Sequence, residues 1–459
     1  MDILLNPVIV SVIVMCVLCL LKFNVLLAII VSAVVAGLAA GMPFYISSDA
    51  AKELLAKGVP EYQTKNIIGV LIDGMGGNSE TALSYILLGA FAVGLAHSGL
   101  GTILSVKLSR VLSGKKFFMI FAIAFIACFS QNLVPVHIAF IPILIPPLLG
   151  LMNKLKIDRR AMACALTFGL KAPYVSIPLG FGLLFHNILV ENINNAGKEL
   201  GIEISVADTS KVMWIGGLSM IIGLIICVLL LYGKDREYKD APVPGTVEHT
   251  DVKMTKEAWG ALVGCVVVAV TSIITKSLPY SATLGLFTMI VTGCVKYKSL
   301  DDVVNGGIGM MGFIAFVMLV AAGYGYLLKT SGAVDSLVKS ASVYMQSSKA
   351  MAAFILLLVG LLITMGIGTS FGTVPIVTAI YVPLCHTIGF SVPSIILLIG
   401  IAAALGDAGS PASDSTMGPT SGLNADGQHD HIWDTCVPTF IAYDITLIIG
   451  GVIGAVILG

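Results

Sequence analysis

The chain has 459 residues, of which 57% are hydrophobic and 11% charged, and its mean hydropathy is +0.98. Soluble domains carry about 25% charged residues, so this composition excludes a soluble globular protein. The formal net charge is zero and does not indicate a nucleic-acid partner. Because each bilayer crossing needs roughly 20 mostly apolar residues, we predict an integral membrane protein of about ten to twelve helices in contact with lipid.

The first apolar stretch begins at the N-terminus, in MDILLNPVIVSVIVMCVLCLLK. An acidic residue stands where a signal peptide carries basic ones, and no small-residue cleavage site follows. We therefore predict that this stretch is retained as the first membrane helix. The nine cysteines lie almost all in apolar stretches, where small apolar filling is a better interpretation than a redox or metal site.

The apolar stretch at about 117–150 is interrupted by FSQNLVPVH. Basic residues flank it at 107–116 and at 154–160. Because basic loops stay in the cytoplasm, we expect the chain to enter and leave the membrane on one side here. The sequence thus predicts a re-entrant hairpin, or two short helices, at about 117–150.

A second interruption, KAPYVSIP, falls in the apolar stretch at about 161–185. Proline removes a backbone donor and clashes with the preceding helical turn, so we expect a broken helix with its break at Lys171 to Pro178. The longest polar stretch follows at 233–257 and is rich in lysine and arginine. We predict that it is a cytoplasmic linker between residues 1–232 and 258–459.

The second half repeats the order of the first. SFGTVPIVTAIYVP in the second half resembles SQNLVPVHIAFIP in the first. Each is followed by a second proline-containing motif, which is KAPYVSIP in the first half and GSPASDS in the second. We predict a second hairpin at about 350–390 and a second broken helix at about 394–420. An odd number of spans separates the copies, so the second should run in the opposite direction. The predicted fold is an all-α polytopic membrane protein with two inverted repeats of about five transmembrane helices each.

The breaks supply the expected binding chemistry. Irregular backbone inside a membrane is tolerated only against protein or a polar cavity. Freed carbonyls and hydroxyls can replace the water around Na+, and the N-termini of half-helices can bind a carboxylate. In secondary transporters the breaks of the two halves meet at the binding site. We expect substrate-binding residues at Ser130, Gln131, Asn132, His137, Pro173, Ser176, Ser370, Gly372, Thr373, Ser410 and Ser413.

Carboxylates mark the second broken helix. Asp407 follows the apolar run SIILLIGIAAAL directly, and Asp414 lies in the same segment. A carboxylate at bilayer depth costs roughly 2.5–3.5 kcal/mol and is a functional candidate, which Lys171 can compensate. The alternative is an aspartate at the interface and a snorkelling lysine. We expect Na+ or H+ as the coupling ion, no other cofactor, and cation coupling at Asp407, Asp414, Ser415, Asn132 and Thr373.

Other classes fit less well. Gly406-Asp407 and Tyr443-Asp444 superficially resemble the residues of an intramembrane aspartyl protease, but their order is reversed and Ala404 stands where a glycine is needed. A channel would also use carbonyls and carboxylates, whereas inverted halves with hairpins imply alternating access. Two histidines beside one aspartate, at 429–431, are a pattern of low specificity for a metal. We predict neither an enzyme nor a metal site.

Residues 406–440, GDAGSPASDSTMGPTSGLNADGQHDHIWDTCVPTF, resemble the signature of the bacterial Na+/H+ antiporter family, with its NhaC-like antiporters and YuiF-like permeases of the ion transporter superfamily. The resemblance implies two inverted repeats, each with a re-entrant hairpin and a broken helix. It also implies that the SQN and SFGT tips and GDAGSPASDST line the substrate and cation sites. Members of the superfamily are often homodimers, and a multi-pass protein of the bacterial inner membrane is expected.

The polar tips favour an organic cargo. Carrying cations alone needs little more than carboxylates, whereas two neutral polar tips suit hydrogen bonds to a zwitterion or carboxylate. We predict a Na+- or H+-coupled secondary transporter of a small organic solute, with an amino acid as the leading cargo. The alternative is a Na+/H+ antiporter without an organic substrate.

Overall fold

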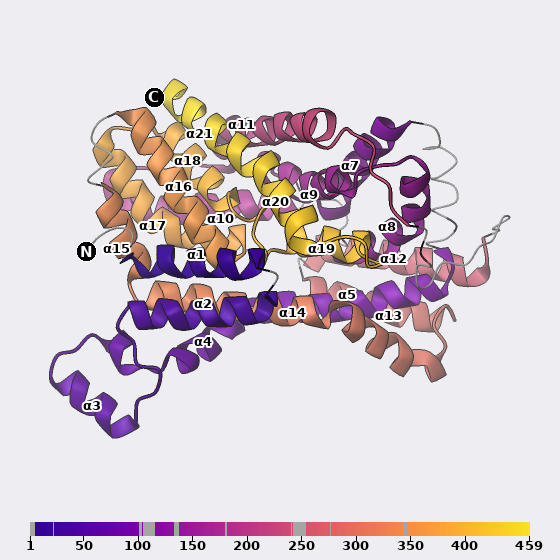
Figure 1. Ribbon diagram of the computed structural model, residues 1–459, viewed down its shortest axis with the longest axis horizontal. Helices are drawn as coiled ribbons and strands as arrows, with labels where there is room; N and C mark the ends of the chain where they lie inside the picture. The colour runs from indigo at the N-terminus through magenta and orange to yellow at the C-terminus, as the bar shows by residue number, and fades with distance from the viewer. Residues whose placement is uncertain are drawn as a thin grey trace.

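The computed structural model describes residues 5–21, 23–100, 103, 115–132, 137–179, 181–239, 241, 254–275, 277–342 and 348–459. Within these ranges every regular element is a helix. The helices form two layers in Figure 1, with α3 (Ser48–Ala56) protruding at one corner. The lower layer contains α1 (Pro7–Leu20), α2 (Val25–Ala39), α4 (Ile67–Met75), α5 (Ser79–His97), α12 (Lys256–Thr275), α13 (Leu278–Val291) and α14 (Leu300–Thr330).

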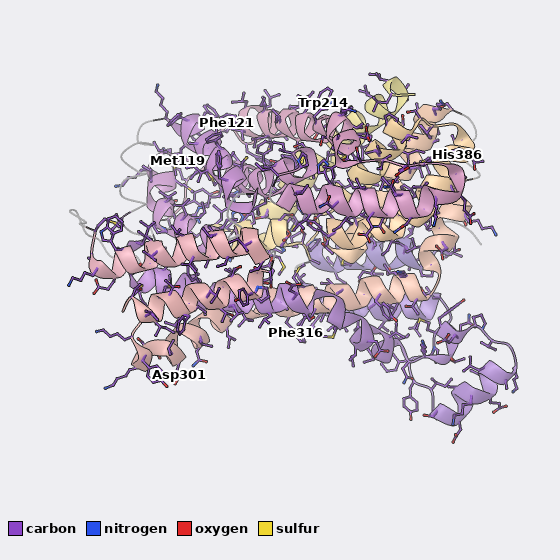
Figure 2. All side chains as sticks on the ribbon, turned by 180° about the vertical axis from the view of Figure 1, so that it is seen from behind. Met119, Phe121, Trp214, Asp301, Phe316 and His386 are labelled. Carbon is purple, nitrogen blue, oxygen red and sulfur yellow. The ribbon has the colours of Figure 1, made fainter. Side chains whose placement is uncertain are left out.

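The composition of the helices is that of a membrane protein. In the described residues four helices are long and apolar enough to cross a bilayer: Val206–Leu231, Met311–Thr330, Lys349–Gly366 and His431–Ile457. A fifth crossing is formed if Ser370–Thr378 and Ile380–Ile388, which are bent by 53°, count as one span. Large apolar side chains face outward, such as those of Trp214 and Phe316 (Figure 2). Their exposed fractions are 53% and 46%. Lipid is the medium in which such a surface is stable.

Small residues bring the two halves of the chain together in the lower layer. A Cβ added at Gly307 of α14 would lie 2.2 Å from the backbone nitrogen of Ala90 in α5. The two backbones therefore touch at this crossing, an arrangement typical of membrane helices. Tyr324 of α14 also bonds Ser11 of α1, with 2.6 Å between the hydroxyl oxygens.

The upper layer contains two sets of helices in the same order. The first set is α7 (Lys116–Asn132), α8 (His137–Lys154), α9 (Arg159–Ser176), α10 (Phe181–Gly197) and α11 (Val206–Ile226). The second is α16 (Lys349–Ile367), α17 (Ser370–Ile388), α18 (Val392–Ala404), α19 (Asp414–Leu423) and the last span, which ends in α21 (Ile445–Ile457). The first three helices of each set start at the same spacing along the chain. The predicted hairpins correspond to α7–α8 and α16–α17, and the inversion between the sets stays a prediction.

The first break lies at the end of the predicted stretch Lys171–Pro178 rather than at Pro173. Helix α9 continues through Pro173 to Ser176, and the described residues 177–179 are non-helical before α10 begins at Phe181. Ile177 still donates its backbone N–H to the Pro173 carbonyl, 2.8 Å away. Proline lacks only its own donor, so the helix keeps its course and Lys171 stays on a regular helical face.

The second break is longer and lies between α18 and α19, at residues 405–413. Gly406 has a left-handed backbone (φ 73°), and a Cβ there would lie 2.7 Å from the Leu361 carbonyl oxygen. Only glycine fits that conformation in that space. The chain then re-enters a helix at Asp414, with Ser413 as its N-cap.

Helix α9 runs antiparallel to the segment that contains this break. Near its start Arg159 pairs with Asp426, in its middle Thr167 donates to the Ser415 carbonyl at 2.8 Å, and near its end Lys171 pairs with Asp407. Polar contacts thus follow the whole line along which the two broken helices meet.

Candidate functional site

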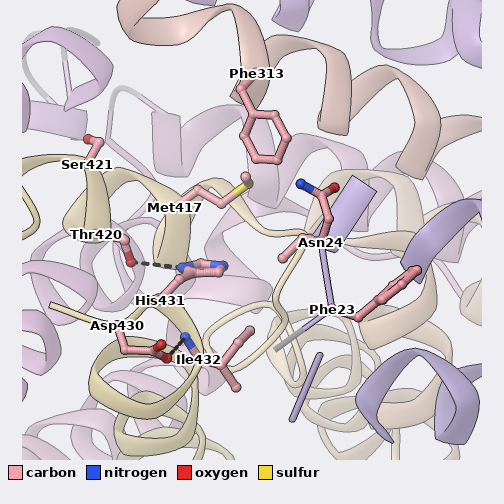
Figure 3. Close-up of a pocket in the computed structure, with 10 residues that line it drawn as sticks. Phe23, Asn24, Phe313, Met417, Thr420, Ser421, Asp430, His431 and Ile432 are labelled. Atoms are coloured by element: carbon pink, nitrogen blue, oxygen red, sulfur yellow. Dashed lines mark hydrogen bonds between the residues drawn. The ribbon is translucent and has the colours of Figure 1, made fainter. Parts of the chain in front are cut away.

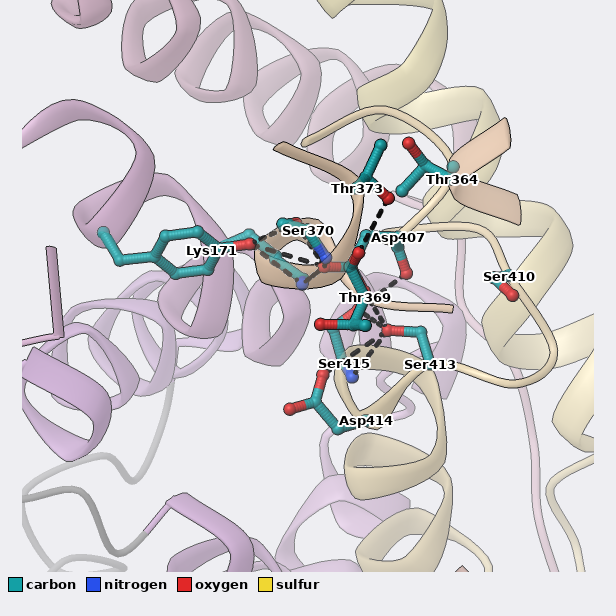
Figure 4. Close-up of polar contacts among 12 residues, drawn as sticks. Lys171, Thr364, Thr369, Ser370, Thr373, Asp407, Ser410, Ser413, Asp414 and Ser415 are labelled. Atoms are coloured by element: carbon teal, nitrogen blue, oxygen red, sulfur yellow. Dashed lines mark hydrogen bonds and ion pairs between the residues drawn. The ribbon is translucent and has the colours of Figure 1, made fainter. Parts of the chain in front are cut away.

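The centre of the site is a buried ion pair between the two sets of helices (Figure 4). The Lys171 ammonium of α9 contacts Asp407 Oδ2 in the second break. Their side chains are only 5% and 3% exposed. The sequence suggested that Lys171 compensates Asp407 or Asp414; the structure pairs it with Asp407, and both side chains are buried inside the protein.

Hydroxyl groups surround the Asp407 carboxylate. Ser370 donates to Oδ2 through its hydroxyl at 2.5 Å and through its backbone N–H at 3.2 Å, and the Ser413 hydroxyl donates to Oδ1. The Ser415 hydroxyl binds the Asp407 carbonyl at 2.8 Å. The backbone bond comes from the first turn of α17, where helix N–H groups lack helical partners and favour an anion.

Tyr174 joins the two charged residues and was missed in the sequence. Its hydroxyl accepts from Lys171 Nζ at 3.0 Å and lies 2.8 Å from Ser370 Oγ and 3.4 Å from Asp407 Oδ2. Residues three apart on a helix lie on the same face. Because α9 is unbroken between Lys171 and Tyr174, the two side chains face the same site, and the sequence spacing could have shown this. The expected break at KAPYVSIP concealed this signal.

Several predicted residues lie beside the ion pair without contacting it. Thr373 donates to the Thr369 carbonyl at 2.8 Å, and Ser410 donates to the Met365 carbonyl at 3.4 Å. Asp414 begins α19, where its carboxylate accepts from Ser413 at 3.4 Å. Gly372 is half-buried in the first turn of α17. These residues frame the site rather than form its centre.

The predicted residues of the first half lie elsewhere or cannot be placed. Pro173 is buried inside α9, and Ser176 donates to the Ala172 carbonyl and packs against Gly217 of α11. Position 176 is therefore turned away from Asp407. The backbones of Ser130, Gln131, Asn132 and His137 lie in α7 and α8, but their side chains lie outside the described part of the chain.

A pocket lies on another side of α19, with a cavity volume of about 420 Å³ (Figure 3). Phe313 and Met417 give it apolar walls, while Thr420 and His431 give it polar ones. His431 Nε2 donates to the Pro411 carbonyl at 2.9 Å, and its Nδ1 lies 2.8 Å from Thr420 Oγ1. One imidazole therefore connects the pocket to the broken segment, a role that the sequence did not suggest.

A second buried cluster lies at the start of α9. Arg159 holds Asp426 through two bonds of 2.6 Å and donates to the Leu423 carbonyl at 3.0 Å. Burial raises the pKa of Asp426, but the bonds from Arg159 outweigh it, and the pKa lies below its ordinary value. Arg236 of the predicted linker binds Asp434 at 2.8 Å. The segments at 156–160, 233–239 and 423–434 thus meet in this cluster.

Comparison with known proteins decides the family. A model of the Na+/H+ antiporter family matches residues 165–455, and a model of the Na+-H+ antiporter family matches residues 6–112. This chain belongs to the Na+/H+ antiporter family. The resemblance of residues 406–440 is confirmed, and the family match spans both partners of the Lys171–Asp407 pair.

Relatives of this antiporter-family chain cover most or nearly all of it. An uncharacterized membrane protein of Haemophilus influenzae is 43% identical over 467 residues, covering 99% of each chain. The putative amino acid transporter YuiF of Bacillus subtilis is 46% identical over 402 residues, covering 84% of this chain and 89% of its own. Among solved structures, the YdaH transporter of Alcanivorax borkumensis has a TM-score of 0.46 and 13% identity, covering 98% of this chain and 97% of its own.

Proposed function

We propose that this protein is a Na+- or H+-coupled secondary transporter that carries a small organic solute, with an amino acid as the leading cargo, across the inner membrane of a bacterium by alternating access. The observation that carries the proposal is the buried Lys171–Asp407 pair with hydroxyls around it. It stands where helices of both halves meet, which is where secondary transporters bind their cargo.

The pair matches the charges of an amino acid. Removing one partner of a buried pair costs about 3–5 kcal/mol because an uncompensated charge remains. A zwitterion can open the pair at smaller cost, since its carboxylate replaces Asp407 on Lys171 and its ammonium replaces Lys171 on Asp407. Tyr174, Ser370 and Ser413 then donate or accept hydrogen bonds at the same place. The site stays neutral throughout the exchange.

Two further observations support this cargo. The pocket beside α19 is within the size range of small-molecule sites, roughly 300–1,000 Å³, and has both apolar and polar walls. The relative YuiF is named a putative amino acid transporter. We infer that solute reaches the ion pair through this pocket and that His431 moves with the Pro411 carbonyl when the broken segment rearranges.

The experiment is uptake of labelled amino acids into proteoliposomes that contain the purified protein. A Na+ gradient, a pH gradient, both and neither are compared. Accumulation of at least one amino acid that depends on one gradient is the expected result. If no amino acid exchanges across the membrane under any gradient, the proposed cargo is wrong.

The second candidate is exchange of Na+ for H+ without an organic substrate, and the family's name favours it. In that case Na+ displaces the Lys171 ammonium from Asp407. The same proteoliposomes, loaded with a pH-sensitive dye, test this candidate. Na+-driven proton movement in the absence of any amino acid would support it.

A further inference from the structure

Asp444, in the last span, is a buried carboxyl group that the substrate site does not use. The residue has no exposed surface, and its Oδ1 accepts the backbone N–H of Gly406 at 3.0 Å. Its Oδ2 has no hydrogen-bond partner among the described residues. Buried carboxyl oxygens are nearly always partnered, so the exception calls for a physical cause.

The backbone around Asp444 is irregular on both sides. Asp444 ends a π-helical turn, Phe440–Asp444, and a second π-helical segment, His431–Cys436, precedes it in the same span. Such turns occur frequently at functional sites. The Gly406 donor belongs to the left-handed residue that opens the second break, directly before Asp407. A movement of Asp407 that shifts the neighbouring Gly406 would therefore change the hydrogen bond from the Gly406 N–H to Asp444.

No positive charge is available to Asp444 in the described structure. Lys171, the cation of the site, is held by Asp407. Among the described residues, the charged groups that act on Asp444 are Asp407 and then Lys171. Of the elements packed on its π-helical turn, α21 and the helical turn Val437–Thr439 have no charged residue, and α11 carries Asp208 and Lys211 only in its first turns. An ionised Asp444 would therefore be a second, uncompensated negative charge next to Asp407.

The space at Oδ2 suits a proton better than a metal ion. A Cβ added at Gly409 would lie 2.9 Å from Oδ2 and 2.7 Å from the Phe440 Cβ. The backbone of the broken segment thus closes over the carboxyl group and leaves no room on that side for Na+ and its other ligands. A proton neutralises the carboxyl without needing that room.

We propose that Asp444 is the proton-carrying residue of the transport cycle, a role that rests on the proposed function and names its coupling group. In the described state the proton is on Oδ2, while Oδ1 accepts from Gly406. When a zwitterion takes over Asp407 and Lys171, the peptide at 406–407 shifts and residues 405–413 open around Asp444. The proton then passes from Oδ2 to water on one side, leaving a carboxylate, and a proton from the other side restores the acid. No other bond is made or broken.

Infrared spectroscopy tests the protonated state directly, because the carbonyl band of a carboxylic acid is separate from the carboxylate bands. Wild-type protein at neutral pH should show a carboxylic acid band. Asp444→Asn, which keeps an acceptor oxygen for Gly406, should lose it. The matched control is Asp434→Asn in the same span, whose carboxylate is held by Arg236, and it should keep the band. A band that persists in Asp444→Asn overturns the proposal.

Transport by the same variants distinguishes the role of Asp444 in proton coupling from the binding of the amino acid. In Asp444→Asn, accumulation driven by a pH gradient should be lost, while exchange of labelled for unlabelled amino acid should remain. Retention of pH-driven accumulation overturns the proton role. If wild-type protein shows the band but exchanges no amino acid, the proposed cargo fails and the protonated Asp444 stands. Should Asp444→Asn not fold, wild-type protein with carboxyl-labelled aspartate must show a shifted band, and an unshifted band overturns the proposal.

Discussion

Two buried ion pairs join α9 to the segment around α19, and they differ in chemistry. Arg159 meets Asp426 with both ends of its guanidinium and also binds the Leu423 carbonyl and Asn153. A guanidinium is always charged, and its planar fork fits one carboxylate geometry closely. Such a pair, with its further bonds made to fixed groups, holds the two segments in one position.

The Lys171–Asp407 pair has the same burial but exchangeable partners. An ammonium is a compact charge with rotatable donors, and the neighbouring Ser370, Ser413 and Tyr174 hydroxyls can each donate or accept. The comparison teaches that burial alone does not make an ion pair a binding site. What distinguishes the two is whether a solute can replace the bonds that are broken.

The largest effect is expected from Asp407→Asn. This variant removes the negative charge that would bind the ammonium of an amino acid, so uptake and exchange should both fall to background. Proteoliposome transport measures the loss, and size-exclusion chromatography checks that the protein is folded. The control is Asp208→Asn, at the exposed N-terminus of α11, which should transport like wild type. Unchanged transport by folded Asp407→Asn would remove Asp407 from the site.

Arg159→Met should act on stability instead. It leaves Asp426 buried without its partner, and a cost of about 3–5 kcal/mol is expected. The midpoint of thermal unfolding in detergent should fall strongly, whereas transport per folded molecule should persist. Two results would contradict a purely stabilising role of the Arg159–Asp426 pair. One is an Arg159→Met variant with the unfolding midpoint of wild type, and the other is a folded Arg159→Met variant that does not transport.

The double variant Lys171→Met/Asp407→Leu sharpens the comparison further. Replacing both partners of a buried pair by apolar residues of similar size is often neutral or stabilising by about 1–4 kcal/mol. Asp407→Asn leaves the Lys171 charge buried without its partner, so its unfolding midpoint should fall. The double variant should regain that midpoint, yet transport nothing. Thermal unfolding and exchange are measured on the same preparation. Any recovered transport would show that the charges are dispensable for cargo.

The sequence pointed to the residues of one pair, with Asp407 or Asp414 as the partner of Lys171, and missed the other pair, for a physical reason. Asp407 stands out because it follows an apolar run, and Lys171 stands out as the cation nearest a proline in another. Asp426 lies in a polar segment and Arg159 in a basic loop, where exposed charges are the usual expectation. Only the fold brings these loops together, so their burial leaves no trace in local composition.

The order of the helices could also be predicted from the sequence, whereas the conformation of the breaks could not. The predicted hairpins at about 117–150 and 350–390 coincide with α7–α8 and α16–α17, whereas helix α10 (Phe181–Gly197) extends well beyond the predicted stretch at about 161–185. It placed the first break at Lys171–Pro178 because proline is expected to end a helix, while the observed α9 absorbs Pro173. Asp444 was noted only as half of a protease-like pair. Its lack of a partner is a property of packing, which no local pattern reports.

The smallest effect concerns His429, which lies outside the membrane spans near the Arg159 cluster. Burial lowers its pKa to about 4, and its Nδ1 has no partner in the described structure. The unfolded chain takes up a proton near pH 6.5 and the folded chain only near 4. Stability should therefore fall as the pH drops through this window, by at most about 1.4 kcal/mol per pH unit, and change no further from this group below it.

Replacing this imidazole should flatten that part of the pH profile. In His429→Gln, thermal unfolding midpoints measured from pH 7 down to pH 4 should decline less steeply than in wild type, because the unfolded state loses its extra proton. The control is His386→Gln, an exposed position on α17, which should leave the profile as it is. A wild-type slope that survives in His429→Gln would assign the acid sensitivity to another group and leave the Arg159 cluster unaffected by protonation at 429.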